Sequence, residues 1–274
     1  MMRAMRTNTM DAEHVITTVA DALRDRPAIR GLFLSGSFGN GQADAYSDID
    51  FVLVAPEGPT DEIAGFWREA VDRTGEIVLW WNPRPALINA ITADWTRTDV
   101  VILKPEQMGA HAQTSLRPLF DHDALYGGLP KEARQPQMPP ARLRHQIEEF
   151  IRVLGLLHLA AGREEYINGV VGVFHLRSKL IDLLIEETAA PDRGGVLHLN
   201  RLLAEEQKRL VTALPPPVAE RQAMIDAHLA YARAYLPRAR RYAAGRGVEW
   251  PERFEAVTWA KLHESLGVDR PYEI

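Results

Sequence analysis

The hydrophobic pattern of the first half alternates between helix-like and strand-like stretches. Residues 11–26 place Val15, Val19 and Leu23 four positions apart, the spacing of one helix face. Thr60-Asp61-Glu62 begins a second helix, because an N-cap residue and acidic side chains precede apolar positions at helical spacing. Short apolar runs predict strands at 32–34, 50–54, 76–81, 87–91 and 99–103. The last two runs flank Ala93-Asp94-Trp95 and predict a hairpin, so the whole pattern predicts a mixed sheet with helices against it.

The second half has only helix-like patterns. Gln135 to Pro140 is rich in proline and predicts a linker. After it, helices are expected at about 147–157, 168–187, 200–213 and 217–241, the last with Pro217 in its first turn. The helix at 168–187 is expected to bury Val170, Val173, Phe174, Ile181 and Leu184. Its other face carries His175, Ser178, Lys179, Asp182 and Glu186. The predicted class is α+β, with a sheet domain at 1–134 and an all-helical domain at 141–274.

Composition narrows the possible functions. The chain has 274 residues and no cysteine, which excludes disulfides and thiolate metal sites. No apolar run reaches the roughly 18–20 residues of a membrane-spanning helix, and no apolar stretch follows Arg3 and Arg6, so we expect a cytoplasmic protein. Residues 1–130 hold 11 basic and 18 acidic residues. This acidic half favours divalent cations or a cationic small molecule, and nucleic acid is not expected as a partner.

Two carboxylates stand at the start of the second predicted strand, in Asp48-Ile49-Asp50. Side chains two positions apart on a strand point to the same face, so both carboxylates lie side by side. Their mutual repulsion is relieved by a divalent cation, and Mg²⁺ prefers carboxylate and phosphate oxygens. The pair therefore predicts a metal site.

A glycine-rich segment lies between the first two strands. Gly36-Ser37 follows the strand at 32–34, and Phe38-Gly39-Asn40-Gly41 comes next. Glycine lets the backbone approach a ligand closely, and free N–H groups with a serine hydroxyl can hold phosphate oxygens. Together with Asp48 and Asp50, this segment predicts a site for a metal-bound triphosphate.

This combination resembles the signature of the nucleotidyltransferase superfamily, which has the polymerase beta-like fold. The signature is an apolar residue, Gly-Ser, about ten residues and then Asp-apolar-Asp; here ten residues separate Ser37 from Asp48, and Ser35 replaces the apolar residue. The segments Gly36–Gly41 and Ser47–Asp50 look most like the antibiotic-modifying members, which act on aminoglycosides or lincosamides, and their uncharacterised bacterial relatives. The specific match covers about residues 32–54, and the order of elements is similar to about Leu125.

The resemblance implies roles for individual residues. Asp48 and Asp50 would hold Mg²⁺, with two ions expected, and Gly36 and Ser37 would hold the β and γ phosphates of ATP or another nucleoside triphosphate. The family has a third carboxylate on a later strand, for which Asp99 is the candidate and Asp94 and Glu76 are the rivals. It would complete the metal site or take the proton from the acceptor hydroxyl.

Other side chains keep two interpretations each. Lys179 either holds the triphosphate or belongs to a solvated helix face. The aromatic residues Trp80, Trp81 and Trp95 either stack on a base or sugar or belong to the core. Glu148 and Glu149 are either a candidate base or a solvated pair.

The resemblance implies a Mg²⁺-dependent enzyme that transfers AMP, or another nucleotide, to a hydroxyl of a small molecule, in a role such as antibiotic resistance. The helical half would form the acceptor side. Two alternatives stay open: an AMP-transferase acting on proteins, as in toxin–antitoxin pairs, and a non-catalytic nucleotide-binding protein. Nucleic-acid polymerisation is disfavoured because no basic, aromatic-rich segment is present. Acceptor, base preference and oligomeric state, including a homodimer, stay open.

Overall fold

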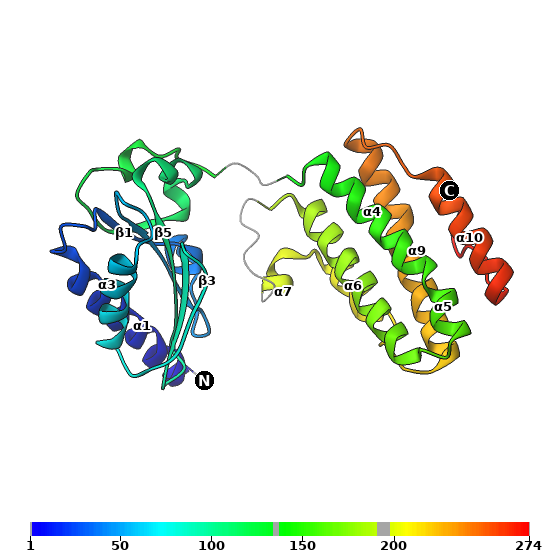
Figure 1. Cartoon of the computed structure of the whole chain (residues 1–274), viewed down its shortest axis with the longest axis horizontal. Helices are drawn as coiled ribbons and strands as arrows, with labels where there is room; N and C mark the ends of the chain where they lie inside the picture. Colours follow the sequence, from blue (N-terminus) through cyan, green and yellow to red (C-terminus); the bar gives the residue numbers. More distant parts are fainter. Residues whose placement is uncertain (1, 134–136, 191–197, 274) are drawn as a thin grey trace. The chain divides into compact units, whose positions relative to one another are not determined.

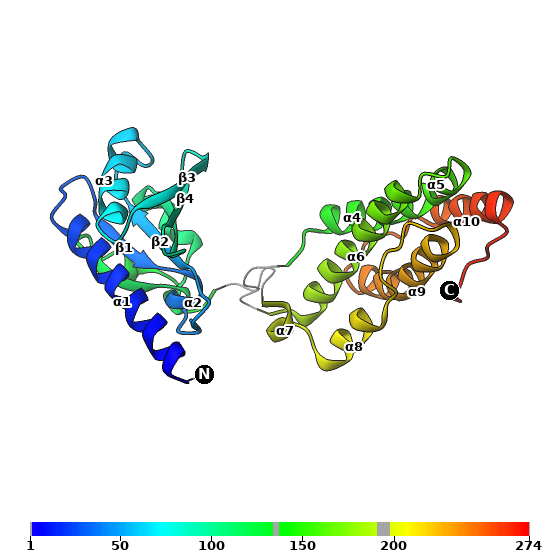
Figure 2. The ribbon, with the colours of Figure 1, turned by 90° about the horizontal axis from the view of Figure 1, so that it is seen from below.

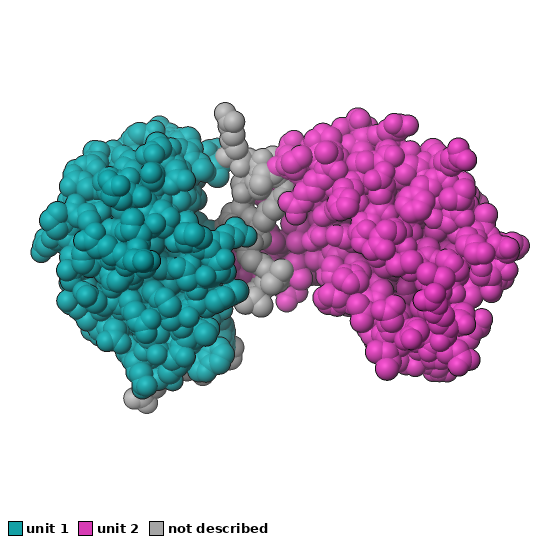
Figure 3. All heavy atoms as spheres, viewed as in Figure 1, with its two compact units in different colours: residues 1–134 teal, residues 135–274 magenta. Residues whose placement is uncertain are grey.

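The computed structural model describes residues 2–133, 137–190 and 198–273, and for residues 2–11 the backbone alone. The chain divides into two compact units, Met1–Arg134 and Gln135–Ile274 (Figure 3). Within the predicted linker, Gln135 and Pro136 lie outside the described residues, and Pro140 already begins a helix. No helix among the described residues is long and apolar enough to cross a membrane.

A six-stranded mixed sheet forms the centre of the first unit. Its strands follow the spatial order β3-β4-β5-β2-β1-β6. Their bounds are β1 Gly31–Leu34, β2 Ile49–Val54, β3 Ile77–Arg84, β4 Leu87–Thr92, β5 Arg97–Leu103 and β6 Arg117–Asp121. The pair β2–β5 is parallel, and the other neighbouring pairs are antiparallel. The predicted α+β class with a helical second half is confirmed.

Two helices cover one face of this sheet. These are α1 (Met2–Arg24) and α3 (Asp61–Asp72), whose N-cap Thr60 accepts a hydrogen bond from the Ile63 backbone N–H (Figures 1 and 2). Apolar side chains of both helices form one core with the strands, with Phe51 packed edge-on against Trp67. On the opposite face, Met108, Leu116 and Leu129 pack against Phe33, Val52 and Val54.

Three details of the first unit differ from the sequence predictions. The first helix begins at Met2 and ends at Arg24, because Pro27 and the turn before it stop it early. The third strand continues to Arg84 and forms its own hairpin with β4, so β3, β4 and β5 run as a meander. Strand β6 was not predicted, because Arg117-Pro118-Leu119-Phe120-Asp121 has proline inside it; proline is tolerated there because β6 is an edge strand.

The second unit is entirely helical in its described part. Its helices are α4 Pro140–Gly155, α5 Leu157–Gly162, α6 Tyr166–Thr188, α7 Leu199–Leu202, α8 Glu205–Ala213, α9 Arg221–Gly245 and α10 Glu252–Leu266 (Figure 1). They share one hydrophobic core, in which the rings of Phe150 and Tyr235 stack 3.9 Å apart.

Several helix predictions for the second unit need correction. The stripe at 147–157 is divided between α4 and α5, and the helix at 200–213 is divided between α7 and α8. The last predicted helix begins at Arg221 rather than Pro217, because Glu220 still has extended backbone angles. Helix α10 was not predicted.

The buried face of α6 also differs from the prediction. Phe174 is 61% exposed, whereas Leu176, Leu180 and Leu183 are fully buried. So many α6 positions are apolar that the sequence spacing did not select the inward face. Glu186, expected on the polar face, is buried and accepts a hydrogen bond from the Met138 backbone N–H at 3.1 Å.

Candidate active site

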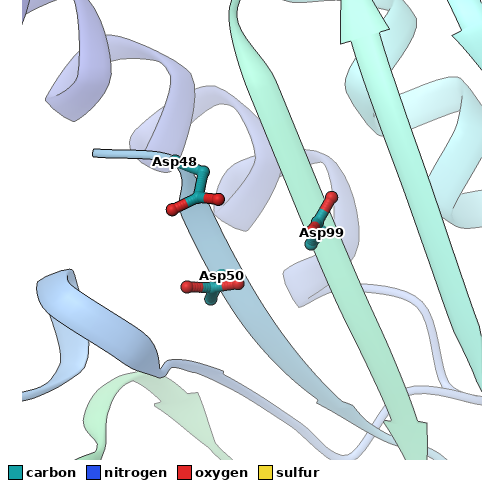
Figure 4. Close-up of side chains that lie close together, drawn as sticks. All are labelled: Asp48, Asp50 and Asp99. Carbon is teal, nitrogen blue, oxygen red and sulfur yellow. The ribbon is translucent and has the colours of Figure 1, made fainter. Parts of the chain in front are cut away.

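Strand register brings the three predicted carboxylates together. Asp50 on β2 is the direct parallel partner of Asp99 on β5, so both side chains leave the same face of the sheet. Asp48 immediately precedes β2. One carboxylate oxygen from each of the three residues lies within 4.8 Å of the others, which is close enough to share a metal ion (Figure 4). Among the described residues, these three form the only group of this kind.

Gly36 lies against the Asp50 carboxylate. Its φ angle is +55°, and a Cβ atom at this position would lie 2.1 Å from Asp50 Oδ2. The neighbouring Ser35 N–H donates to the Asp50 backbone oxygen at 2.9 Å. Only glycine permits both this backbone conformation and this close approach, so the position of Asp50 requires a glycine at position 36.

The glycine-rich segment predicted as a loop begins as a helical turn. Residues Gly36–Gly39 form α2, and the chain turns at Gly41, where φ is +74°. Inside α2 the Ser37 hydroxyl oxygen is buried and has no hydrogen-bond partner among the described residues. Burying a hydroxyl without a hydrogen-bond partner costs free energy, and a ligand that accepts its hydrogen bond would remove that cost.

The three carboxylates oppose one another electrostatically. Burial raises the pKa of Asp50 to about 6, with further contributions from the negative charges of Asp48 and Asp99. Burial also raises the pKa of Asp99, and the Asn89 amide, on the neighbouring strand β4, partly offsets this. Three acidic groups this close together are a candidate site for a divalent cation.

Arg97 is a site residue that the sequence reasoning missed. Its Nη1 atom lies 3.5 Å from Asp48 Oδ2, and its Nη2 donates to the Tyr46 backbone oxygen at 3.2 Å. Its charge lowers the pKa of both Asp50 and Asp99. Arg97 lies two positions before Asp99 and therefore shares its face, a signal that was available once the strand start had been placed at Arg97.

The two rivals for the third carboxylate lie elsewhere. Asp94 is in the turn between β4 and β5, where its carboxylate accepts hydrogen bonds from the hydroxyls of Thr92 and Thr96 at 2.5 and 2.9 Å. These bonds hold the pKa of Asp94 below its usual value, as expected for a structural turn residue. Glu76 precedes β3 and is exposed.

The remaining candidate residues, Lys179, Glu148 and Glu149, lie near charged side chains of the second unit. Lys179 belongs to the second unit and lies near Glu149 and Asp182; burial raises the pKa of Asp182, and the charge of Lys179 offsets this only in part. Its predicted role in triphosphate binding stays a prediction. Glu148 and Glu149 pair with Arg144 and Arg152 at 2.5 and 2.7 Å.

The tryptophans differ in environment. Trp80 is half-buried, with the Arg68 guanidinium 5.0 Å from its ring centre, as a core-edge residue would be. Trp81 and Trp95 are 58% and 75% exposed. The prediction that strand aromatics belong to the core therefore holds only for Trp80.

Residues 16–83 match the family of the nucleotidyltransferase domain. This stretch contains Gly36, Ser37, Asp48 and Asp50 and ends before Asp99. The match confirms the resemblance drawn from these residues and the predicted enzyme class, a nucleotidyltransferase. Among curated proteins, no relative matches the chain.

Two solved structures are similar over most of the chain. An aminoglycoside 6-adenyltransferase from Bacillus subtilis is 13% identical, with a TM-score of 0.42, over 89% of this chain and 95% of the other. The spectinomycin adenyltransferase AAD(9) from Enterococcus faecialis, solved with ATP and spectinomycin, is 12% identical, with a TM-score of 0.35, over 83% and 99% of the two chains. Neither likeness is strong enough to identify a substrate.

Proposed function

We propose that this nucleotidyltransferase is Mg²⁺-dependent and transfers AMP from ATP to a hydroxyl group of a small molecule. The observation that carries the proposal is the juxtaposition of three converging carboxylates, Asp48, Asp50 and Asp99, with Gly36 directly against Asp50. A bound cation would relieve the repulsion between these carboxylates, and the glycine leaves room for a phosphate chain beside them.

The residues present suit Mg²⁺. Asp48, Asp50 and Asp99 offer only hard oxygen ligands, and the pKa of about 6 for Asp50 reflects burial and negative neighbours that a bound cation would compensate. Bound there, the metal would neutralise the negative charge of the triphosphate and of the departing pyrophosphate. The number of ions, two by resemblance, is part of the proposal.

The phosphate chain would bind on the β1 side of Asp50. Ser37 would donate its unpartnered, buried hydroxyl to a phosphate oxygen, and Gly36 would allow the chain to approach the backbone. This contact turns an unsatisfied hydroxyl into a hydrogen-bonded one, so ligand binding would recover the cost of burying it.

Asp99 would take the proton of the acceptor hydroxyl. In the reaction the acceptor oxygen forms a bond to the α-phosphorus, the bond from that phosphorus to the β-phosphate bridging oxygen breaks, and pyrophosphate leaves with that electron pair. The position of Asp99 beside Asp50 in the sheet would bring its carboxylate close to the attacking oxygen. The main contribution of the protein is positioning and charge compensation.

The acceptor is proposed by class only. The sequence resemblance favours an aminoglycoside or lincosamide antibiotic, and the acidic residues 1–130 favour a molecule that carries amino groups. A role for the helical unit on the acceptor side and a cytoplasmic location are parts of the same proposal.

The test is a pyrophosphate-release screen with Mg²⁺, the four nucleoside triphosphates and a panel of antibiotics, run on the wild type and on Asp50→Asn. We expect release with ATP that depends on both Mg²⁺ and an acceptor, and a loss of about 10⁴-fold in Asp50→Asn, because the transition state then lacks a metal-binding carboxylate.

Three controls test the folding of the variant, the specificity of the carboxylate and the class of acceptor. Circular dichroism must show that Asp50→Asn is folded, and Asp94→Asn, a carboxylate outside the site, should retain activity. Full activity in folded Asp50→Asn would contradict the proposed site. With ATP labelled in its α-phosphate and a cell lysate, label in a protein band instead of the small-molecule fraction would favour a protein acceptor.

A further inference from the structure

The register of the sheet extends the carboxylate site into a row that crosses four strands. Asp50 pairs with Asp99, Asp99 pairs with Asn89, and Asn89 pairs with Trp81. Direct partners on neighbouring strands point to the same face, so these side chains stand on the face that carries the metal site. Because strands are about 4.8 Å apart, Trp81 lies about 10 Å from Asp99 along this row.

Trp81 belongs to an apolar area of that face. It is 58% exposed, and Leu79 and Val101, which stand on the same face of β3 and β5, are also partly exposed. The group of residues that covers this face near β1 and β2, with Met108 and Leu116, does not include them. Trp81, Leu79 and Val101 therefore form an apolar surface beside the carboxylates, which we call the Trp81 platform.

The strand order decides which substrate would meet this platform. In-line displacement requires the attacking oxygen to approach the phosphorus from the side opposite the departing pyrophosphate. Ser37 and Gly36, which would hold the phosphates that leave, follow β1. Since the order is β3-β4-β5-β2-β1, the opposite side of Asp50 is that of Asp99, Asn89 and Trp81. The acceptor, and not the pyrophosphate, would therefore lie along the row.

The chemistry of the row also describes the acceptor. Asp99 at one end suits a hydroxyl group, and Trp81 at the other suits the C–H face of a saturated ring, which packs flat on an indole. A ring with hydroxyls on its rim and an apolar face, such as a cyclitol or sugar ring, satisfies both ends.

We propose that Trp81 is a specificity-determining residue, on which a hydroxylated ring of the acceptor stacks while its hydroxyl group faces Asp99. The inference rests on the proposed function, because it takes the acceptor site from the direction of nucleotidyl transfer. It adds an acceptor-binding residue on β3 to the residues proposed for the metal and the phosphates.

Binding is tested in the full-length protein labelled with ¹⁵N-tryptophan, with Mg²⁺ and α,β-methylene ATP present. Spectinomycin, kanamycin and lincomycin, all of which contain hydroxylated rings, serve as probes. We expect at least one of them to shift the indole N–H resonance of Trp81, identified by its loss in Trp81→Phe, while the resonance of the buried Trp67 stays in place.

Kinetics supply the second readout. For a ring that is nucleotidylated, Trp81→Ala should raise KM for the acceptor about tenfold and leave kcat and KM for ATP within about twofold, because stacking acts on acceptor binding. Trp81→Phe should restore most of the affinity, since it keeps an aromatic ring. Val78→Ala changes an equally exposed apolar side chain of the same strand and is the matched control, which should leave all three constants unchanged.

The outcomes separate the inference from the proposed function. Pyrophosphate release without a shift of Trp81, or with an unchanged acceptor KM in Trp81→Ala, overturns the platform and leaves the proposed function standing. A Trp81 shift without release for any nucleotide supports the platform and counts against the proposed transfer. If no probe shifts Trp81 or is nucleotidylated, the platform for hydroxylated rings is overturned.

Discussion

Each unit contains a cluster built around a carboxylate that is largely removed from water. In one cluster, donors and a cation surround the carboxylate; in the other, its neighbours include two further carboxylates. In the second unit, Glu255 is 2% exposed and accepts hydrogen bonds from Arg240 and Trp250, both at 2.6 Å, and from the Tyr272 hydroxyl. Burial alone would raise the pKa of Glu255, but these hydrogen bonds and the charge of Arg240 outweigh burial and lower it.

In the first unit, Asp50 has no such partners. Among the described residues, no side chain donates a hydrogen bond to the Asp50 carboxylate, whereas three side chains donate to Glu255. The charged neighbours of Asp50 include the two carboxylates Asp48 and Asp99. Its pKa is raised to about 6. Arg97 is the one cation that lowers it, and Arg97 contacts Asp48 only at 3.5 Å.

The difference distinguishes a structural carboxylate from one poised for a ligand. A buried carboxylate with a full set of donors stabilises the fold, whereas repelling carboxylates reduce stability unless a cation binds. Sites of the second kind are typical of function, because stability is lost there in exchange for binding. Neutralising the central carboxylate should therefore change stability with opposite signs in the two clusters, a loss at Glu255 and a gain at Asp50.

The largest expected change in stability is a loss in the second unit. Glu255→Gln removes the charge that compensates Arg240, and we expect the free energy of unfolding to fall by about 3 kcal/mol, the low end for a broken buried ion pair because Arg240 keeps Glu252. Hydrogen exchange of the backbone amides in α9 and α10 measures this locally.

Glu252→Gln is the matched control for that variant. Glu252 contacts the same Arg240 but its side chain is 63% exposed, so we expect a loss below about 1 kcal/mol. Equal losses in the two glutamate variants would show that the hydrogen bonds from Trp250 and Tyr272 do not distinguish Glu255.

The next effect has the opposite sign. In the absence of divalent cations, Asp50→Asn should stabilise the first unit by about 1–2 kcal/mol at pH 7.5, after allowance for partial exposure. Because the folded pKa of about 6 exceeds the ordinary 3.8, the folded state binds this proton more tightly. The stability of the wild type is therefore highest below about pH 4 with respect to this group and falls as pH rises through 6.

Thermal unfolding from pH 5 to 8 in EDTA, followed by hydrogen exchange in β2 and β5, tests this sign. The gain in Asp50→Asn should be smaller at pH 5 and should reverse when Mg²⁺ is added, since Mg²⁺ stabilises only the protein that binds it. Asp94→Asn should lose stability instead, because the pKa of Asp94 is lowered by its turn hydrogen bonds. A destabilised Asp50→Asn in EDTA would contradict the comparison.

The sequence pattern predicted the parts of the site that depend on local spacing, and it did not predict those that depend on long-range pairing. The motif that joins Gly36 and Ser37 to Asp48 and Asp50 is local in the sequence, and strand alternation alone places Asp48 and Asp50 on one face. Pairing Asp50 with Asp99 required the parallel register of β2 and β5, which no local pattern sets. Asp99 was selected through a family resemblance, and the register now explains its position.

Contacts that depend on long-range packing were missed. Arg97 meets Asp48 only through the same parallel pairing, and Glu255 acquires its partners from α9, the segment before α10 and the residues after α10, a helix that was not predicted. The buried and exposed faces of α6 were partly confused because its apolar residues surround most of the helix, as the exposure of Phe174 shows.

The smallest expected effect is that of Arg97→Met, which is measured against Arg240→Met in the other cluster. Arg97→Met should cost less than about 1 kcal/mol in EDTA, because the pair with Asp48 is 3.5 Å long and both side chains are about one third exposed. The loss should disappear with Mg²⁺, when a bound cation neutralises the carboxylates in place of the guanidinium. Arg240→Met, by contrast, leaves the buried Glu255 without its ion pair and should cost at least twice as much under both conditions. Thermal unfolding with and without Mg²⁺ measures both variants. A Mg²⁺-independent loss above about 2 kcal/mol in Arg97→Met would show that Arg97 acts as Arg240 does, as part of the framework of its unit.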